Sequence, residues 1–281
     1  MLSLEKLIQR SDKLGTLPAI VNRIFEVMDN PKSTATQIGR IINDDPALTA
    51  RLLKLVNSPF YGFASKVDTV YRAIALIGHQ ELRSVVLATS AVKIFEGIPS
   101  DLVSMPTFWR RSLNTAVVSR VLAAFQRRKE IERYFIAGLL HNIGSLVLYL
   151  QMPDEMNKAL AMQQEEHVPL WQAEDQLMSF NHADVGGALL KKWNLPPVLY
   201  QAVTYHLYPE DAPEIYRDTA MLVHLASQIE SEVIEPLAQG REPGEIEPEI
   251  WQANNLSSDI LQTVLEKAEQ QYSASKDIFL S

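Results

Sequence analysis

The stretch Phe135-Ile-Ala-Gly-Leu-Leu-His-Asn-Ile-Gly-Ser-Leu-Val-Leu-Tyr-Leu150 is the most apolar run of the chain. It contains a His-Asn pair and two glycines, and it falls short of the roughly 18 apolar residues that a membrane span needs. We therefore expect it to form the buried centre of a soluble fold, and we expect no membrane partner.

Helical spacing extends outward from this stretch in both directions. Apolar residues recur three and four positions apart, as in Ile20, Ile24 and Val27, and no segment alternates as a strand would. Asp45-Pro46 and Thr16-Leu-Pro18 are typical helix starts, with a capping side chain and a proline in the first turn. The pattern predicts an all-α protein.

The amino-acid composition excludes several kinds of chemical site. The 281 residues include no cysteine, which excludes disulfides, iron–sulfur clusters, thiolate zinc sites and a cysteine nucleophile. The net charge of −8 hides an asymmetry, because residues 1–150 carry a net charge of +7 and residues 151–281 carry −15. Together with a charged N-terminus that lacks the apolar core of a signal peptide, this composition predicts a cytoplasmic protein.

Three of the six histidines are candidates for a shared site. His141, His182 and His206 lie on separate predicted helices, and helical bundles build their polar sites from side chains on facing helices. His79 and His167 are expected at the surface, and the apolar neighbours of His224 predict a core histidine.

The same stretches resemble a known family. Phe135 to Gly144 is similar to the signature helix of the HD superfamily of metal-dependent phosphohydrolases, and the rest resembles its degenerate branch, the HD-related output domain (HDOD). The other matching stretches include Asp45-Pro-Ala-Leu-Thr-Ala-Arg-Leu-Leu53, Val56-Asn-Ser-Pro-Phe-Tyr-Gly62, Ala73-Ile-Ala-Leu-Ile-Gly78, His182-Ala-Asp-Val-Gly186 and Trp193-Asn-Leu-Pro196.

The resemblance implies a domain organisation. An HDOD domain is expected over residues 13–212, as two packed helical lobes. The first lobe ends near residue 100, and the second, from about residue 105, resembles the HD helical core. Residues 213–281 are expected as a C-terminal helical extension that packs on the second lobe, with an acidic loop at about 231–249.

The resemblance also implies which residues a catalytic HD centre needs. Arg111 lies where an early metal-binding histidine is expected, Asn142 replaces the paired aspartate, and Ser227 replaces the late aspartate. An arginine repels a metal ion, and an amide is a poorer ligand than the carboxylate that bridges two metals. We therefore expect no catalytic residues and no cofactor, but a vestigial pocket of Arg111, His141, Asn142, His182, His206 and Ser227.

Two uses of that pocket remain open beside an inert polar core. The neutral imidazoles of His141, His182 and His206 are enough to hold a single divalent metal such as zinc. Alternatively, Arg111 and the histidines could receive a phosphate or carboxylate ligand.

The expected function is a non-catalytic bacterial signal-transduction module that acts through other signalling proteins or a small ligand. One alternative is a residual phosphohydrolase acting on a nucleotide or cyclic dinucleotide. The other is a nucleic-acid-binding regulator using Arg127, Arg128 and Lys129, although the acidic composition predicts no nucleic-acid partner. A candidate partner-facing or inter-lobe loop comprises Asn57, Ser58, Phe60, Tyr61 and Gly62, and a simple tight turn explains it equally well.

Overall fold

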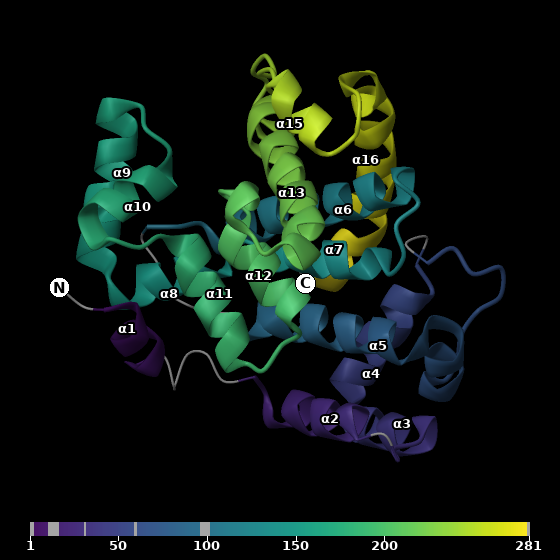
Figure 1. Ribbon diagram of the computed structural model, residues 1–281. Coiled ribbons are helices and arrows are strands. Elements are labelled where there is room, and N and C mark those ends of the chain that lie inside the picture. The colour runs from purple at the N-terminus through teal and green to yellow at the C-terminus, as the bar shows by residue number, and fades with distance from the viewer. Residues whose placement is uncertain (1–2, 11–16, 31, 59–60, 96–101, 280–281) are drawn as a thin grey trace. The chain divides into compact units, whose positions relative to one another are not determined.

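The protein is entirely helical where its structure is described. The computed structural model describes residues 3–10, 17–30, 32–58, 61–95 and 102–279, and these ranges contain helices and turns but no strand (Figure 1). The predicted all-α class is therefore confirmed. The chain divides into two compact units, which we call unit 1 (residues 1–16 and 97–264) and unit 2 (residues 17–96 and 265–281).

Unit 1 holds most of the helices, including all those that carry the candidate histidines. Its elements are α1 (Leu4–Arg10), α6 (Met105–Phe125), α7 (Ile131–Leu140), α8 (Ile143–Gln151), α9 (Pro153–Glu166), α10 (Leu170–Met178), α11 (His182–Lys192), α12 (Pro197–Tyr205), η2 (Pro209–Asp211), α13 (Glu214–Ile229), the π-helical turn η3 (Glu230–Ile234), α14 (Glu235–Ala238), α15 (Pro248–Ala253) and η4 (Ser258–Ile260).

Unit 2 contains short helices whose starts follow from local sequence. They are α2 (Ala19–Asp29), α3 (Ala35–Asn43), α4 (Pro46–Val56) and α5 (Val70–Ile94). Thr34 and Gln37 form a capping box at the start of α3, and the Asp45 side chain accepts a hydrogen bond from Leu48 N at 2.9 Å at the start of α4. Helix α5 is kinked at Gly78, where φ is +81°. These caps satisfy backbone N–H groups that helix ends leave unpaired.

The C-terminal extension is divided between the two units. Helix α16 (Leu261–Phe279) begins in unit 1, but from Leu265 onward it belongs to unit 2, where Lys54 Nζ donates to the carbonyl of Asp277 at 3.0 Å. This differs from the expectation that all of residues 213–281 pack on the second lobe. Residues 265–279 of the helix are therefore described with unit 2.

The expected acidic loop at 231–249 is partly helical. Residues 230–238 continue α13 as the π turn η3 and then α14, so only residues 239–247 are irregular before α15 begins. The acidic side chains Glu230 and Glu235 account for the difference, because both are buried against arginines of α6 and do not face solvent.

Helix α6 is the central element of unit 1. Every residue from Ser112 to Ala123 is buried, because α7, α13 and η3 all pack against it. The stretch Ile131–Gln151 contains an 18-residue window that is apolar enough to cross a membrane, which corrects the expectation that no apolar run reaches that length. Inside the fold, however, 78% of that window is buried. It is broken into α7 and α8 at His141 and Asn142, as expected for core helices.

Two glycines set the close approach of the helices that carry the histidines. A Cβ atom on Gly144 of α8 would lie 2.0 Å from the carbonyl oxygen of His182, and one on Gly187 of α11 would lie 1.7 Å from Thr204 Oγ1 of α12. Only residues without a Cβ allow such contacts, so these positions determine how near α8, α11 and α12 come to one another.

Replacing Gly144 by alanine is expected to lower the free energy of unfolding of unit 1 by about 3 kcal/mol, since α8 and the backbone of His182 must separate. Urea unfolding followed by tryptophan fluorescence measures this, because all four tryptophans lie in unit 1. The control is Gly240→Ala, where no atom is within 4 Å and only the positive φ of 68° adds a cost, about 1 kcal/mol. Equal losses in the two variants would contradict the packing argument.

Candidate functional site

Three histidines from three helix ends meet inside unit 1. His141 follows α7, His182 is the first residue of α11, and His206 follows α12. The ring centroids of His141 and His206 are 5.1 Å apart, and those of His182 and His206 are 5.6 Å apart. All three side chains are buried. We call these three residues the histidine cluster.

Backbone carbonyls orient two of the imidazoles. His141 Nδ1 lies 2.6 Å from the Gly138 carbonyl oxygen, and His206 Nδ1 lies 2.7 Å from that of Val203. Because a carbonyl only accepts, each Nδ1 carries the proton and each Nε2 keeps its lone pair. Burial, reinforced by the neighbouring histidines, lowers the pKa of His141 to about 3 and that of His206 well below its usual value. Both rings are therefore neutral at pH 7.

His182 has the opposite electrostatic character. Its Nδ1 donates to Glu174 Oε2 at 2.7 Å, and its backbone N–H donates to the same oxygen at 2.9 Å. Burial acts to lower the pKa of His182, but the charge and hydrogen bond of Glu174 outweigh it, and the pKa is raised. The cluster thus combines two neutral rings with one ring that favours the protonated state.

A capping box places His182 at this point. The Asn181 side chain accepts hydrogen bonds from Ala183 N at 2.9 Å and Asp184 N at 3.3 Å, and Asn181 N donates to Asp184 Oδ2 at 3.1 Å. This reciprocal cap determines where α11 begins, so its first residue points toward α10 and Glu174.

Arg111 is held by a carboxylate near the cluster. Its Nε donates to Glu230 Oε2 at 3.0 Å, and the neighbouring Arg110 Nη2 lies 2.7 Å from Glu235 Oε2. Glu230 is buried, and burial raises its pKa although Arg111 opposes the shift. The positive charge of Arg111 also contributes to lowering the pKa of His141.

The π-helical turn explains how both carboxylates reach adjacent arginines. Residues five apart in an α-helix point roughly 140° away from each other. In η3 the backbone N–H of Glu235 donates to the carbonyl of Glu230, five residues earlier. The wider turn brings the two side chains toward the same face, where Arg110 and Arg111 lie.

The other two expected pocket residues make no recorded contact with the cluster. Asn142 is the half-buried residue before α8, and its side chain does not cap that helix. Ser227 Oγ donates to the carbonyl of His224 at 2.8 Å. His224 in turn donates through Nδ1 to the carbonyl of His206 at 2.8 Å. Its ring is hydrogen-bonded, but it is half-buried and not in the core as its apolar neighbours predict.

These donors do not fit the two-metal centre of an HD phosphohydrolase. Asn142 and Ser227 supply no carboxylate, and Arg111 supplies a fixed positive charge instead of an imidazole. Among the residues that the structure describes, no group of three histidine, aspartate or glutamate side chains is arranged to hold a metal ion.

Sequence reasoning missed three charged or polar members of this site. Glu174 is fully buried, Glu230 nearly so, and burial raises the pKa of Tyr149 to about 12, with the negative charge of Glu174 adding to the effect. The sequence did indicate that Glu174 is buried, since helical spacing places it among Leu170, Ala173 and Met178 on the apolar face of its helix. Glu230 had none, because the π turn that orients it is not visible in the sequence.

The candidate loop of unit 2 is closed by its own polar side chains. Asn57 Nδ2 donates to the carbonyls of Leu53 at 2.7 Å and Val67 at 2.6 Å, and Asn57 Oδ1 accepts from Val67 N at 2.7 Å. Ser58 Oγ donates to the Leu55 carbonyl at 2.7 Å.

The aromatic part of that loop lies nearer the surface. Tyr61 stacks on Phe63 with ring centroids 5.8 Å apart, and Gly62 is exposed with φ of +64°. Phe60 lies outside the described residues. Asn57 and Ser58 therefore stabilise the turn itself. Of the described members, Asn57 and Gly62 are exposed, Tyr61 is half-buried and Ser58 is buried.

Fold and site together define an all-α protein with an HD-like histidine cluster and altered metal-binding positions. The HDOD domain model matches residues 14–209, and the chain belongs to the HDOD family. A curated protein of Treponema pallidum (strain Nichols), itself uncharacterized, is 26% identical over 77% of this chain. The chain spans only 42% of that relative's length.

Solved structures show the same fold. An HDOD domain protein of unknown function from Geobacter sulfurreducens superposes with a TM-score of 0.74 and 22% identity, covering 96% of both chains. A Marinobacter aquaeolei VT8 protein provisionally named a signal transduction protein superposes with a TM-score of 0.71 and 20% identity. The match covers 99% of this chain and 65% of the Marinobacter chain. A Shewanella amazonensis SB2B protein provisionally named a metal-dependent phosphohydrolase superposes with a TM-score of 0.68 and 20% identity. The match covers 98% of this chain and 96% of the Shewanella chain.

Proposed function

We propose that this protein is a non-catalytic, cytoplasmic signalling module whose histidine cluster is structural. The observation that carries the proposal is the Arg111–Glu230 ion pair at 3.0 Å beside the buried cluster. In this pair the Arg111 guanidinium and the Glu230 carboxylate bind each other, at the place where metal-dependent hydrolysis would need metal ligands. The HDOD family and the name of the Marinobacter relative favour a regulatory role.

The proposed partners are other signalling proteins or a small ligand, with no cofactor. A nucleic-acid partner is disfavoured by the net charge of −8. Within the basic run that follows α6, the charge of Arg128 is also balanced by Asp218 at 3.1 Å, although its Nη2 can still donate a hydrogen bond. Nucleic-acid binding needs free cations that release counterions from phosphates. Only Arg127 and Lys129 of that run are left without a recorded ion pair.

The test combines metal analysis with turnover assays on the purified protein. We expect substoichiometric Mn, Fe and Zn, and no hydrolysis of bis-p-nitrophenyl phosphate or a cyclic dinucleotide with or without added Mn²⁺. The matched variant is His141→Ala. Stoichiometric metal, with turnover that disappears in His141→Ala, would show a residual phosphohydrolase and overturn the proposal.

A second arm addresses nucleic acid. We expect the protein to pass through a DNA or RNA column at about 0.15 M salt without retention. Retention that falls steeply with salt and is weakened by neutralising Arg127 and Lys129 would instead support a nucleic-acid-binding regulator.

A further inference from the structure

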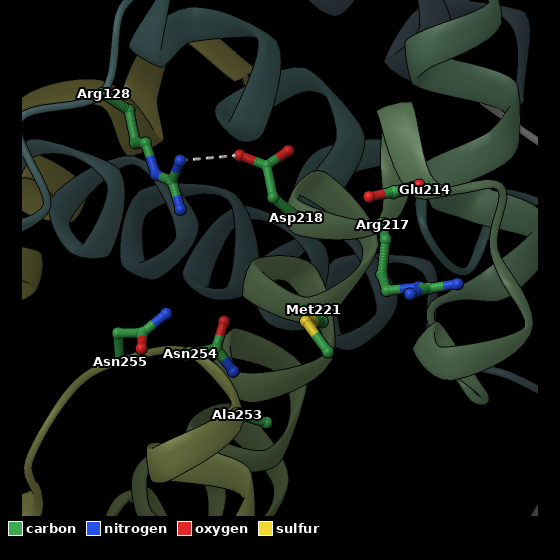
Figure 2. Close-up of a pocket in the computed structure, with 8 residues that line it drawn as sticks. All are labelled: Arg128, Glu214, Arg217, Asp218, Met221, Ala253, Asn254 and Asn255. Carbon is green, nitrogen blue, oxygen red and sulfur yellow. Dashed lines mark ion pairs between the residues drawn. The ribbon is translucent and has the colours of Figure 1, made fainter.

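We propose that unit 1 has a second site, a surface pocket that binds a free, neutral L-amino acid. The pocket measures about 190 Å³ and lies between one face of α13, the end of α15 with the turn after it, and Arg128 in the connection between α6 and α7 (Figure 2). Its lining residues are Arg128, Glu214, Arg217, Asp218, Met221, Ala253, Asn254 and Asn255. None of them belongs to the histidine cluster or to the Arg111–Glu230 pair, and all but Arg128 lie beyond the HDOD match.

The walls of the pocket are held in place by internal contacts. Asp218 Oδ2 accepts from Arg128 Nη1 at 3.1 Å and from the Tyr134 hydroxyl at 3.0 Å. Arg128 Nε donates to Gln126 Oε1 at 2.8 Å, and the Gln126 amide donates to the carbonyl of Asn254. The pocket therefore exists before a ligand arrives, which lowers the entropic cost of binding.

Several polar groups on the walls have no recorded protein partner. Arg128 Nη2 makes no recorded hydrogen bond or ion pair, and neither does the Asn255 side chain. Asn254 Nδ2 donates to the carbonyl of Ile250 at 2.9 Å, so its Oδ1 is the atom left free. Figure 2 shows the Arg128 guanidinium and both amides turned toward the same space, whereas the Arg217 guanidinium points away.

The charges select a ligand that carries both signs. Asp218 is neutralised by Arg128, while Glu214, one helical turn earlier on the same face of α13, is exposed and has no recorded ion pair. Glu214 and Asn254 Oδ1 can accept hydrogen bonds from an ammonium group. Arg128 Nη2 and the Asn255 amide can donate to a carboxylate. A simple anion would be repelled by Glu214, and a simple cation would leave Arg128 Nη2 and the Asn255 amide without an acceptor.

The size and the apolar wall select an amino acid over a larger molecule. A volume of 190 Å³ corresponds to roughly six water molecules, well below the range typical of drug-sized ligands. Met221 and Ala253 offer apolar contact for a short side chain. An amino acid between alanine and methionine in size satisfies both the charges and the volume.

The probe is L-valine, measured by calorimetry and by the thermal shift of tryptophan fluorescence on the full chain. We expect saturable binding and a rise in Tm with concentration. Valinamide lacks the carboxylate and N-acetyl-L-valine lacks the ammonium group, and each should bind at least roughly tenfold more weakly. No saturable binding of L-alanine, L-valine or L-methionine at millimolar concentration would overturn the proposal.

Variants place the ligand in this pocket. Glu214→Gln should weaken L-valine binding roughly tenfold, whereas the same change at exposed Glu242, outside the pocket, should leave it unaltered. Asn255→Asp, at a position with φ of +52° that aspartate tolerates, should repel the carboxylate. Unchanged binding in both pocket variants would show that L-valine binds elsewhere and would overturn the assignment to this pocket. The readout is binding, not turnover, so it stands apart from the test of the histidine cluster.

Discussion

Acidification from pH 6.5 to 4.5 is expected to lower the free energy of unfolding of unit 1 by about 2 kcal/mol through His141 alone, because its buried ring stays neutral while the unfolded chain binds a proton. Burial lowers the pKa of His141 to about 3. A depressed histidine pKa means that the unfolded state holds more protons below about pH 6.5. His206, whose pKa burial also lowers well below its usual value, adds to the loss in the same direction.

Other titratable side chains also affect how the stability of unit 1 depends on pH. His224, whose pKa burial also lowers, acts in the same direction. The raised pKa of His182 gives stability that is fully present below about pH 6.5 and is lost only as pH rises through the folded value, so it adds no slope in this window. Glu230, whose pKa burial raises, binds a proton more readily in the folded state and opposes the loss at the acidic end.

The measurement is urea unfolding between pH 7 and 4.5, followed by tryptophan fluorescence, which reports unit 1 alone. His141→Gln should flatten the slope by about one proton, and the same change at His167, which is exposed and also lies in unit 1, should not. Stability that stays constant or rises on acidification would show that the cluster is not held neutral.

Replacing Glu174 by alanine is expected to destabilise unit 1 by roughly 3–5 kcal/mol at pH 6, since it leaves a buried imidazolium without its counter-charge. The change also removes the acceptor for the backbone N–H of His182, so two buried donors lose their partner. Loss of the carboxylate should at the same time lower the pKa of His182, because burial alone acts in that direction.

Two measurements separate these effects. Urea unfolding of Glu174→Ala, His182→Ala and the double variant gives the coupling between the two residues, and a proton NMR titration of the imidazole gives the His182 pKa. Glu165→Ala, an exposed glutamate on α9, is the matched control and should change neither. Additive losses in the double variant would mean that the pair is not an energetic unit.

Local signals in the sequence were enough for the helices and for the family. Capping residues such as Thr34 and Asp45, and the pair of Asn181 and Asp184 at the start of α11, act within four residues of the chain, so their effect can be predicted from sequence alone. The spacing of His141, His182 and His206 predicted a shared pocket for the same reason, because each lies at a helix end whose position local sequence determines.

The electrostatic roles within the cluster needed the tertiary structure. Three identical side chains acquire different protonation preferences only because Glu174 lies beside His182, while carbonyl groups face His141 and His206. The Arg111–Glu230 pair joins residues 119 positions apart through a π turn. The division of α16 between two units likewise depends on long-range packing.

The sequence by itself determined that this chain is all-α and that it carries HDOD motifs. The resemblance to HD enzymes further implies that Arg111, Asn142 and Ser227 replace metal ligands. The tertiary structure decided which charges are buried and which side chain each one meets. Capping and helical periodicity act over a few residues, whereas burial and ion pairing depend on which distant segments come into contact.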